Sequence, residues 1–212
     1  MNAFHFYSRL DLTILLDEHA TDAKQLLKGI ESVPDASIYF HTHKYLLQYH
    51  YLIPVPPNDF ANWALTSLND DVLGEQLSSI DIMQSGSIPE LRERIAEVVR
   101  SYVKKNPRNK RECPPGEEFY FMATQTVILP TPIVSRSLEE FSNHIEQISL
   151  HSLYYHMFDS RLRLGRGEND FSAWFRGIGK PELADKVRTL DPYLSTLEGL
   201  RAQIKALVKK YE

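Results

Sequence analysis

Two serine–histidine pairs are the residues of this sequence best suited to chemistry. Ser37 precedes His41 by four residues, and Ser152 precedes His156 by the same interval. Side chains four apart share a helix face, so each hydroxyl can approach an imidazole as in a nucleophile–base pair. No residue that would orient the imidazole can be identified, and no glycine elbow surrounds either serine. The favoured interpretation is a half-buried histidine that hydrogen-bonds a neighbouring segment, ahead of ligand binding and of catalysis.

A second motif, Asn-Asp-Phe-x-x-Trp, begins at Asn58 and again at Asn169. Asparagine is a common helix N-cap, and the following aspartate strengthens the first turn, while Phe and Trp enter the core. The alternative is a polar pocket with aromatic walls, of the kind that binds sugars. Recurrence of the motif favours the first interpretation, because a duplicated fold needs its caps and core twice whereas one site needs a single copy.

The two halves differ most between His156 and Asn169. This stretch carries Arg161, Arg163 and Arg166 with two glycines, whereas the matching first-half stretch contains three prolines and no arginine. Guanidinium groups bind phosphate or carboxylate through paired hydrogen bonds, and glycines allow close backbone approach. The favoured interpretation is a loop whose arginines pair with the acidic first half; the alternative, which is the sharpest functional hypothesis of the sequence, is an anion site.

The histidines do not form a convincing metal site. Those at positions 41 and 43 are two apart, which on a helix points them in opposite directions. The single cysteine, Cys113, makes a structural zinc site unfavourable. We therefore predict no metal and no cofactor.

The two halves of the sequence are similar to each other. Matching positions lie 115 residues apart from Phe4 to His41, and further matches with small offsets follow. Several matched blocks in one order indicate an internal duplication. We predict repeat 1 over residues 1–106, a charged, proline-containing linker over 107–118 and repeat 2 over 119–212. The matched blocks begin at Phe4 and Phe119, Ser37 and Ser152, Asn58 and Asn169, and Leu91 and Leu200.

Each repeat opens with a strand-like alternation, from Phe4 to Ile14 and from Phe119 to Leu129, where Pro130 and Pro132 should end the second strand. Amphipathic stretches of helical period follow. The prediction is a predominantly α fold of the α+β class: two α-rich repeats, each one strand and about five helices. A lone strand leaves its backbone unpaired, so the repeat strands should pair in a short sheet about a pseudo-twofold axis.

Composition narrows the class of protein. The 212 residues include 42% apolar side chains, typical of a globular protein, and carry a net charge of −4. Nine basic residues stand against fourteen acidic ones in residues 1–106, and twelve against eleven in 119–212. This balance does not favour a nucleic-acid binder. One cysteine, no signal-peptide pattern and no apolar run of membrane length predict a cytoplasmic protein without a membrane partner.

Four blocks in the second half resemble an uncharacterised bacterial and archaeal family, the domain of unknown function 5752. They are Ser-Leu-Tyr-Tyr-His from residue 152, Arg-Leu-Arg-Leu-Gly-Arg-Gly from 161, Asn-Asp-Phe-Ser-Ala-Trp from 169 and Leu-Asp-Pro-Tyr from 190. The resemblance covers nearly the whole chain. It implies a stand-alone soluble protein of about this length and supplies no catalytic residues.

These observations predict a non-catalytic module that binds a small molecule or anion, or a regulatory interaction module with an acidic protein partner. One alternative is an enzyme acting on a small phosphorylated or carbohydrate substrate, with His156 as acid/base near Asp170. Another is a purely structural or protein-interaction protein, for example a homodimer. The candidate binding residues are Arg161, Arg163, Arg166, His156, Tyr154, Asp170, Trp174, His41 and Tyr39.

Overall fold

The computed structural model describes residues 3–43, 58–82, 85–160, 167–190 and 195–212. Within these residues the fold is predominantly helical, with one two-stranded antiparallel sheet, as expected for the predicted α+β class. Five described α-helices fall in residues 1–106 and five in 119–212. No helix among these residues is both long and apolar enough to cross a membrane.

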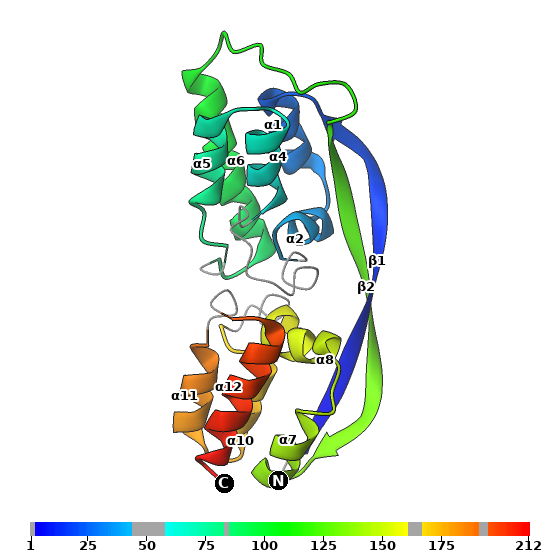
Figure 1. Cartoon of the computed structure of the whole chain (residues 1–212), viewed down its shortest axis with the longest axis vertical. Coiled ribbons are helices and arrows are strands. Elements are labelled where there is room, and N and C mark those ends of the chain that lie inside the picture. The colour runs from blue at the N-terminus through cyan, green and yellow to red at the C-terminus, as the bar shows by residue number, and fades with distance from the viewer. Residues whose placement is uncertain (1–2, 44–57, 83–84, 161–166, 191–194) are drawn as a thin grey trace. The chain divides into compact units, whose positions relative to one another are not determined.

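Strands β1 (Phe4–Ala20) and β2 (Phe119–Ser135) pair with each other, as predicted, but each is 17 residues long rather than short (Figure 1). The expected strand end at Pro130 is wrong, because β2 continues through Pro130 and Pro132. In a two-stranded sheet each strand has one free edge. Prolines two residues apart present their ring nitrogens at the same edge, so neither needs to break the pairing.

The chain divides into two compact units, and each contains part of both strands. Unit 1 holds the described residues up to Asp11 and from Thr126 onward, and unit 2 holds 12–43 and 58–125. This division cuts across the predicted repeat boundaries. The reason is that the aromatic beginning of each strand is buried among helices of the other half of the sequence, so we call β1 and β2 exchanged strands.

Unit 2 contains the first five helices. Asn58 caps its helix as predicted, and Asp22 caps the first helix. The Asp22 carboxylate accepts the Gln25 amide at 2.7 Å. The helices are α1 (Ala23–Ser32), α2 (Asp35–His43), α4 (Asp59–Thr66), α5 (Asp71–Ser78) and α6 (Ile88–Lys105).

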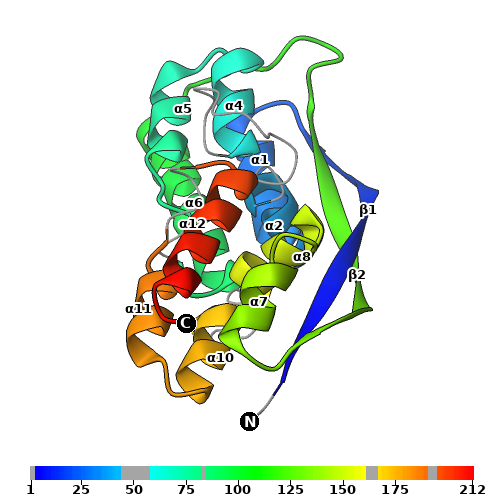
Figure 2. The same ribbon diagram turned by 60° about the horizontal axis from the view of Figure 1, so that its bottom comes forward.

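Unit 1 contains the later helices, of which α10, α11 and α12 are visible together in Figure 2. Asn169 caps its helix as predicted, and Ser137 and Ser149 likewise each accept an amide from the first turn that follows. The elements are α7 (Leu138–His144), α8 (Leu150–Tyr154), the π-helix η1 (Tyr155–Asp159), α10 (Asp170–Gly177), α11 (Pro181–Arg188) and α12 (Leu197–Lys209).

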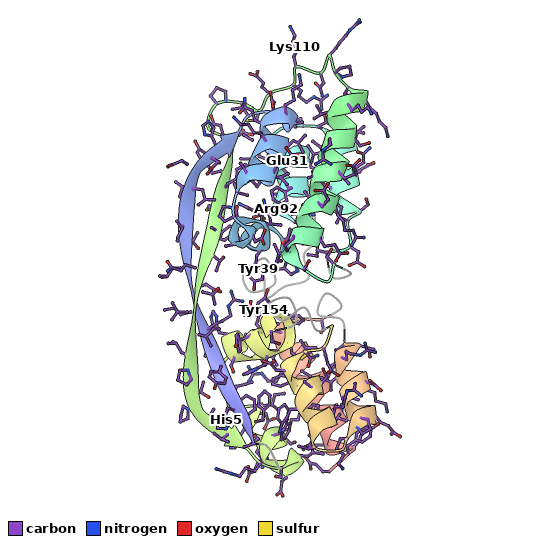
Figure 3. All side chains as sticks on the ribbon, turned by 180° about the vertical axis from the view of Figure 1, so that it is seen from behind. His5, Glu31, Tyr39, Arg92, Lys110 and Tyr154 are labelled. Atoms are coloured by element: carbon purple, nitrogen blue, oxygen red, sulfur yellow. The ribbon has the colours of Figure 1, made fainter. Side chains whose placement is uncertain are left out.

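Residues matched between the halves of the sequence make matched contacts. Arg92 on α6, labelled in Figure 3, donates to the Ile30 carbonyl at the end of α1. Arg201 on α12 donates to the Ile145 carbonyl just after α7. Carbonyls in the last turn of a helix have no partner within the helix, so these arginines satisfy them. Each unit therefore ties its last helix to its first by the same interaction.

We predict that Gly29→Ala destabilises the protein by about 1–3 kcal/mol, as overpacked cores do. Gly29 lies on α1 in unit 2, and a Cβ there would lie 2.2 Å from Cε2 of Phe121 on β2. The free energy of unfolding in urea measures the effect.

The matched control is Gly177→Ala at the end of α10, where a Cβ meets no atom within 4 Å. Alanine has the higher helix propensity, so this variant should be neutral or up to about 1 kcal/mol more stable. Equal stability of the two variants would contradict close packing of β2 against α1.

Candidate functional site

The imidazole of His156 is held on both sides. It lies in the π-helix η1 of unit 1 and is 2% exposed. Its Nδ1 is 2.9 Å from Oδ2 of Asp170, and its Nε2 accepts the backbone N–H of Tyr7 on β1 at 2.8 Å. A backbone amide can only donate, so Nε2 carries the lone pair and Nδ1–H donates to Asp170. The tautomer is therefore fixed by the strand.

His41 repeats this arrangement in unit 2. Its Nδ1 is 2.9 Å from Oδ2 of Asp59, and its Nε2 accepts the Met122 amide of β2 at 3.0 Å. Tyr7 and Met122 are 115 residues apart, as are His41 and His156. In each unit the histidine of one half of the sequence therefore anchors the strand that opens the other half.

Aromatic side chains complete each anchor. In unit 1 the ring of Phe4 lies 4.9 Å from His156, 5.3 Å from Phe171 and 5.6 Å from Trp174. We call His156, Asp170, Phe141, Phe171 and Trp174 the unit 1 socket. In unit 2 Phe119 packs in the same way, with ring-centroid distances of 4.7 Å to His41, 5.2 Å to Phe60 and 5.8 Å to Trp63. The unit 2 socket comprises His41, Asp59, Phe60 and Trp63.

The serine–histidine pairs do not take the arrangement of a nucleophile and base. The Ser152 hydroxyl donates to the Tyr7 carbonyl at 2.6 Å instead of to His156. With Nε2 receiving a backbone amide and Nδ1–H donating to a carboxylate, His156 has no ring nitrogen left for a substrate. The hydrogen bond to a neighbouring segment that the sequence favours is present in both units.

The remaining predicted site residues are dispersed. Trp174 belongs to the unit 1 socket and is 8% exposed, as a core residue. Tyr39 in unit 2 stacks on His43 with ring centroids 5.5 Å apart. Tyr154 in unit 1 is fully buried beneath the guanidinium of Arg9, 5.2 Å from its ring centroid. Three predicted anion-binding residues, Arg161, Arg163 and Arg166, lie outside the described residues.

Unit 1 contains a buried cluster of charged residues that the sequence motifs did not predict. The Arg9 side chain is fully buried, with Nη2 2.6 Å from Oδ1 of Asp11 and Nη1 3.5 Å from Oδ1 of Asp159. Thr126 donates its hydroxyl to Asp11 at 2.8 Å. The other carboxylate oxygen of Asp11 is buried and has no hydrogen-bond partner among the described residues. Desolvating such charges is costly, so their presence calls for a specific role.

The two charges that β1 contributes to this cluster have no charged counterparts on β2. The positions 115 residues after Arg9 and Asp11 are Thr124 and Thr126, which carry no charge. A position-by-position comparison of the two strand sequences would have revealed these charges. A second signal was that Arg9 and Asp11 interrupt a strand that otherwise carries the apolar residues Leu10, Leu12 and Ile14. Features present in both units serve the fold, whereas this cluster distinguishes the units and is a candidate for function.

Two further features bear on binding. A groove of about 690 Å³ lies between α5 and α6 of unit 2, and Ile80 and Val98 are among its lining residues. Its charged lining residues are Glu93, Arg94, Glu97 and Lys105. Its volume is within the range of small-molecule sites, and no predicted binding residue lines it. No group of three or more His, Cys, Asp or Glu that could hold a metal ion occurs within the described part of the chain.

Comparison with known proteins identifies relatives of undefined role. The profile of a family of unknown function, DUF5752, matches residues 1–209. The structure of OrfY from Thermoproteus tenax is similar, with 26% sequence identity and a TM-score of 0.83 over 99% of this chain and 95% of OrfY. No curated protein gives a significant match.

We predict that His41→Ala and His156→Ala each lower the free energy of unfolding by about 2–4 kcal/mol. Each substitution leaves a strand amide and an aspartate without their partner and opens a cavity among buried rings. Urea unfolding followed by circular dichroism measures the loss.

The control is His151→Ala on α8, whose side chain is exposed. A surface substitution of this kind should change stability by no more than about 0.5 kcal/mol. If His156→Ala were as stable as His151→Ala, the anchoring role would be wrong.

Acid should weaken unit 2 through His43. Burial lowers the pKa of this imidazole from its ordinary 6.5 to about 4. Below pH 6.5 His43 therefore binds a proton in the unfolded chain but stays neutral in the folded chain until the pH approaches 4. We expect the free energy of unfolding to fall by roughly 3 kcal/mol in all as the pH drops between these two pKa values, and this contribution to be fully retained above pH 6.5.

His43→Phe isolates this contribution, because phenylalanine keeps an aromatic ring next to Tyr39 and cannot be protonated. Urea unfolding of both proteins from pH 7.5 to pH 4 gives the comparison. Parallel pH profiles for the two proteins would show that His43 does not titrate as described.

Proposed function

We propose that this chain, which belongs to the family of unknown function DUF5752, is a non-catalytic binding or interaction module. The observation that carries the proposal is that both ring nitrogens of His41 and of His156 are already hydrogen-bonded, one to an aspartate and the other to the backbone of an exchanged strand. An acid/base role for His156 would first require release of the Tyr7 amide and exposure of a ring that is 2% accessible. The enzymatic alternative is correspondingly less favoured.

The ligand class that we propose is anionic. Three guanidinium groups within six residues, Arg161, Arg163 and Arg166, suit a phosphate or carboxylate on a small molecule or an acidic protein. The described cluster does not serve this purpose, since Arg9 is already neutralised by two carboxylates. The matching stretch of the first half contains no arginine.

We further infer that the two halves arose by internal duplication and are related by a pseudo-twofold axis. Matched helix caps, arginine contacts and histidine anchors support this inference. So does the bond between Thr126 and Asp11, because these positions are 115 residues apart and would face each other across such an axis. A single anion site in one half fits a duplicated scaffold in which one copy diverged.

A protein partner is the second candidate, and exposed apolar side chains on the strands favour it. In unit 1 Leu10 is 53% exposed, Val127 41% and Leu129 46%. Apolar groups gathered on one sheet commonly mark an interaction surface. A homodimer in the cytoplasm would be one form of this candidate.

Isothermal titration calorimetry with inorganic phosphate, sugar phosphates and nucleotides tests the anion proposal. We expect at least one of these probes to bind the wild-type protein. The triple change of Arg161, Arg163 and Arg166 to Gln should weaken binding about tenfold or more, as loss of charge-assisted hydrogen bonds does, with an unchanged melting temperature.

The matched control changes Lys104, Arg108 and Lys110 to Gln, which removes the same charge at the end of α6 and in the linker. Equal weakening by both triple variants would indicate a general charge effect. Absence of binding by every probe would overturn the anion proposal.

A further inference from the structure

The sockets recognise a simple pattern. Each holds an extended segment with aromatic rings two residues apart, Phe4 and Phe6 in unit 1 and Phe119 and Phe121 in unit 2. The amide of the residue after the second ring then donates to the socket histidine. The same binding mode therefore occurs twice in one chain, with two different segments.

The side chain between the two rings takes little part in recognition. His5 is exposed in unit 1, and Tyr120 at the matching position of unit 2 is 47% exposed. Tyr7 in unit 1 and Met122 in unit 2 both contribute their backbone amide, although their side chains differ in shape and polarity. Backbone bonds supply affinity and alternate side chains supply specificity, as when a strand is added to a sheet.

We propose that the unit 1 socket is a binding site for an extended aromatic-x-aromatic segment supplied in trans, and that its partner is a second copy of this chain acting through β1. Any second copy carries two segments that already fit such sockets. An incoming strand would regain the hydrogen bond to His156, the Ser152 bond to a backbone carbonyl and the rings of Phe141 and Phe171. Exchange of identical elements between protomers is a low-cost route to a dimer.

This inference deepens the proposed function, because it names a protein partner for an interaction module. It does not depend on the arginine stretch or on any anion. Calorimetry with phosphate probes and the strand experiment below can therefore succeed or fail independently.

The test weakens the chain's own strand and supplies another. In the full-length Phe4→Ala/Phe6→Ala variant β1 loses the two rings that fill the socket, and the melting temperature should fall by about 5 °C or more. A peptide of residues 4–11 should restore at least half of that fall. A peptide of residues 119–126 should do the same, because it carries the same pattern.

Two controls fix the interpretation. The peptide of residues 4–11 with alanine in place of both phenylalanines should restore nothing, and adding His156→Ala to the variant should abolish rescue. Phe4→Ala alone repeats the test with a milder loss if the double variant does not fold. Rescue by the alanine peptide, or failure of either aromatic peptide in both backgrounds, would overturn the proposed site.

Chain mixing tests the partner. The Phe4→Ala/Phe6→Ala chain has an intact socket and a defective strand, whereas His156→Ala has a defective socket and an intact strand. We expect the mixture, and neither chain alone, to form a heterodimer in size-exclusion chromatography with light scattering. A mixture that stays monomeric would overturn the second copy as partner.

Discussion

One hydrogen bond recurs at the base of both units: a strand amide donates to the Nε2 of a buried histidine, whose Nδ1–H is bound by an aspartate. Because the donor is a backbone amide, the bond fixes the strand's position whatever its side chain. Rings of Phe4 or Phe119 then fill the surrounding socket. The cores of unit 1 and unit 2 are each complete only when a strand from the opposite half of the sequence is present.

This arrangement explains why catalytic-looking residues serve the fold. Asp170 follows the Asn169 cap in the first turn of α10, which brings its carboxylate to His156. An aspartate, a histidine and a nearby serine resemble a hydrolytic site in composition. In this structure the imidazole's accepting nitrogen is directed at β1, so the same three residue types act as a strand anchor.

Differences between the units carry more functional information than their similarities. The cluster around Arg9 places buried charges where the other strand has Thr124 and Thr126. The arginine stretch beginning at Arg161 likewise has no first-half counterpart. Anchors found in both units are explained by the needs of the two cores, whereas these two features distinguish one half of the sequence from the other.

The sequence by itself determined the elements: amphipathic periods and the caps Asn58 and Asn169 are local signals, and both asparagines cap helices as predicted. It also determined that the strands pair, because a lone strand cannot satisfy its backbone. The tertiary structure alone decided which helices each strand joins, since matched repeats offer equivalent sockets and residue patterns cannot distinguish them. It likewise decided that His156 is anchored by Tyr7, 149 residues away, because a backbone donor leaves no trace in side-chain motifs.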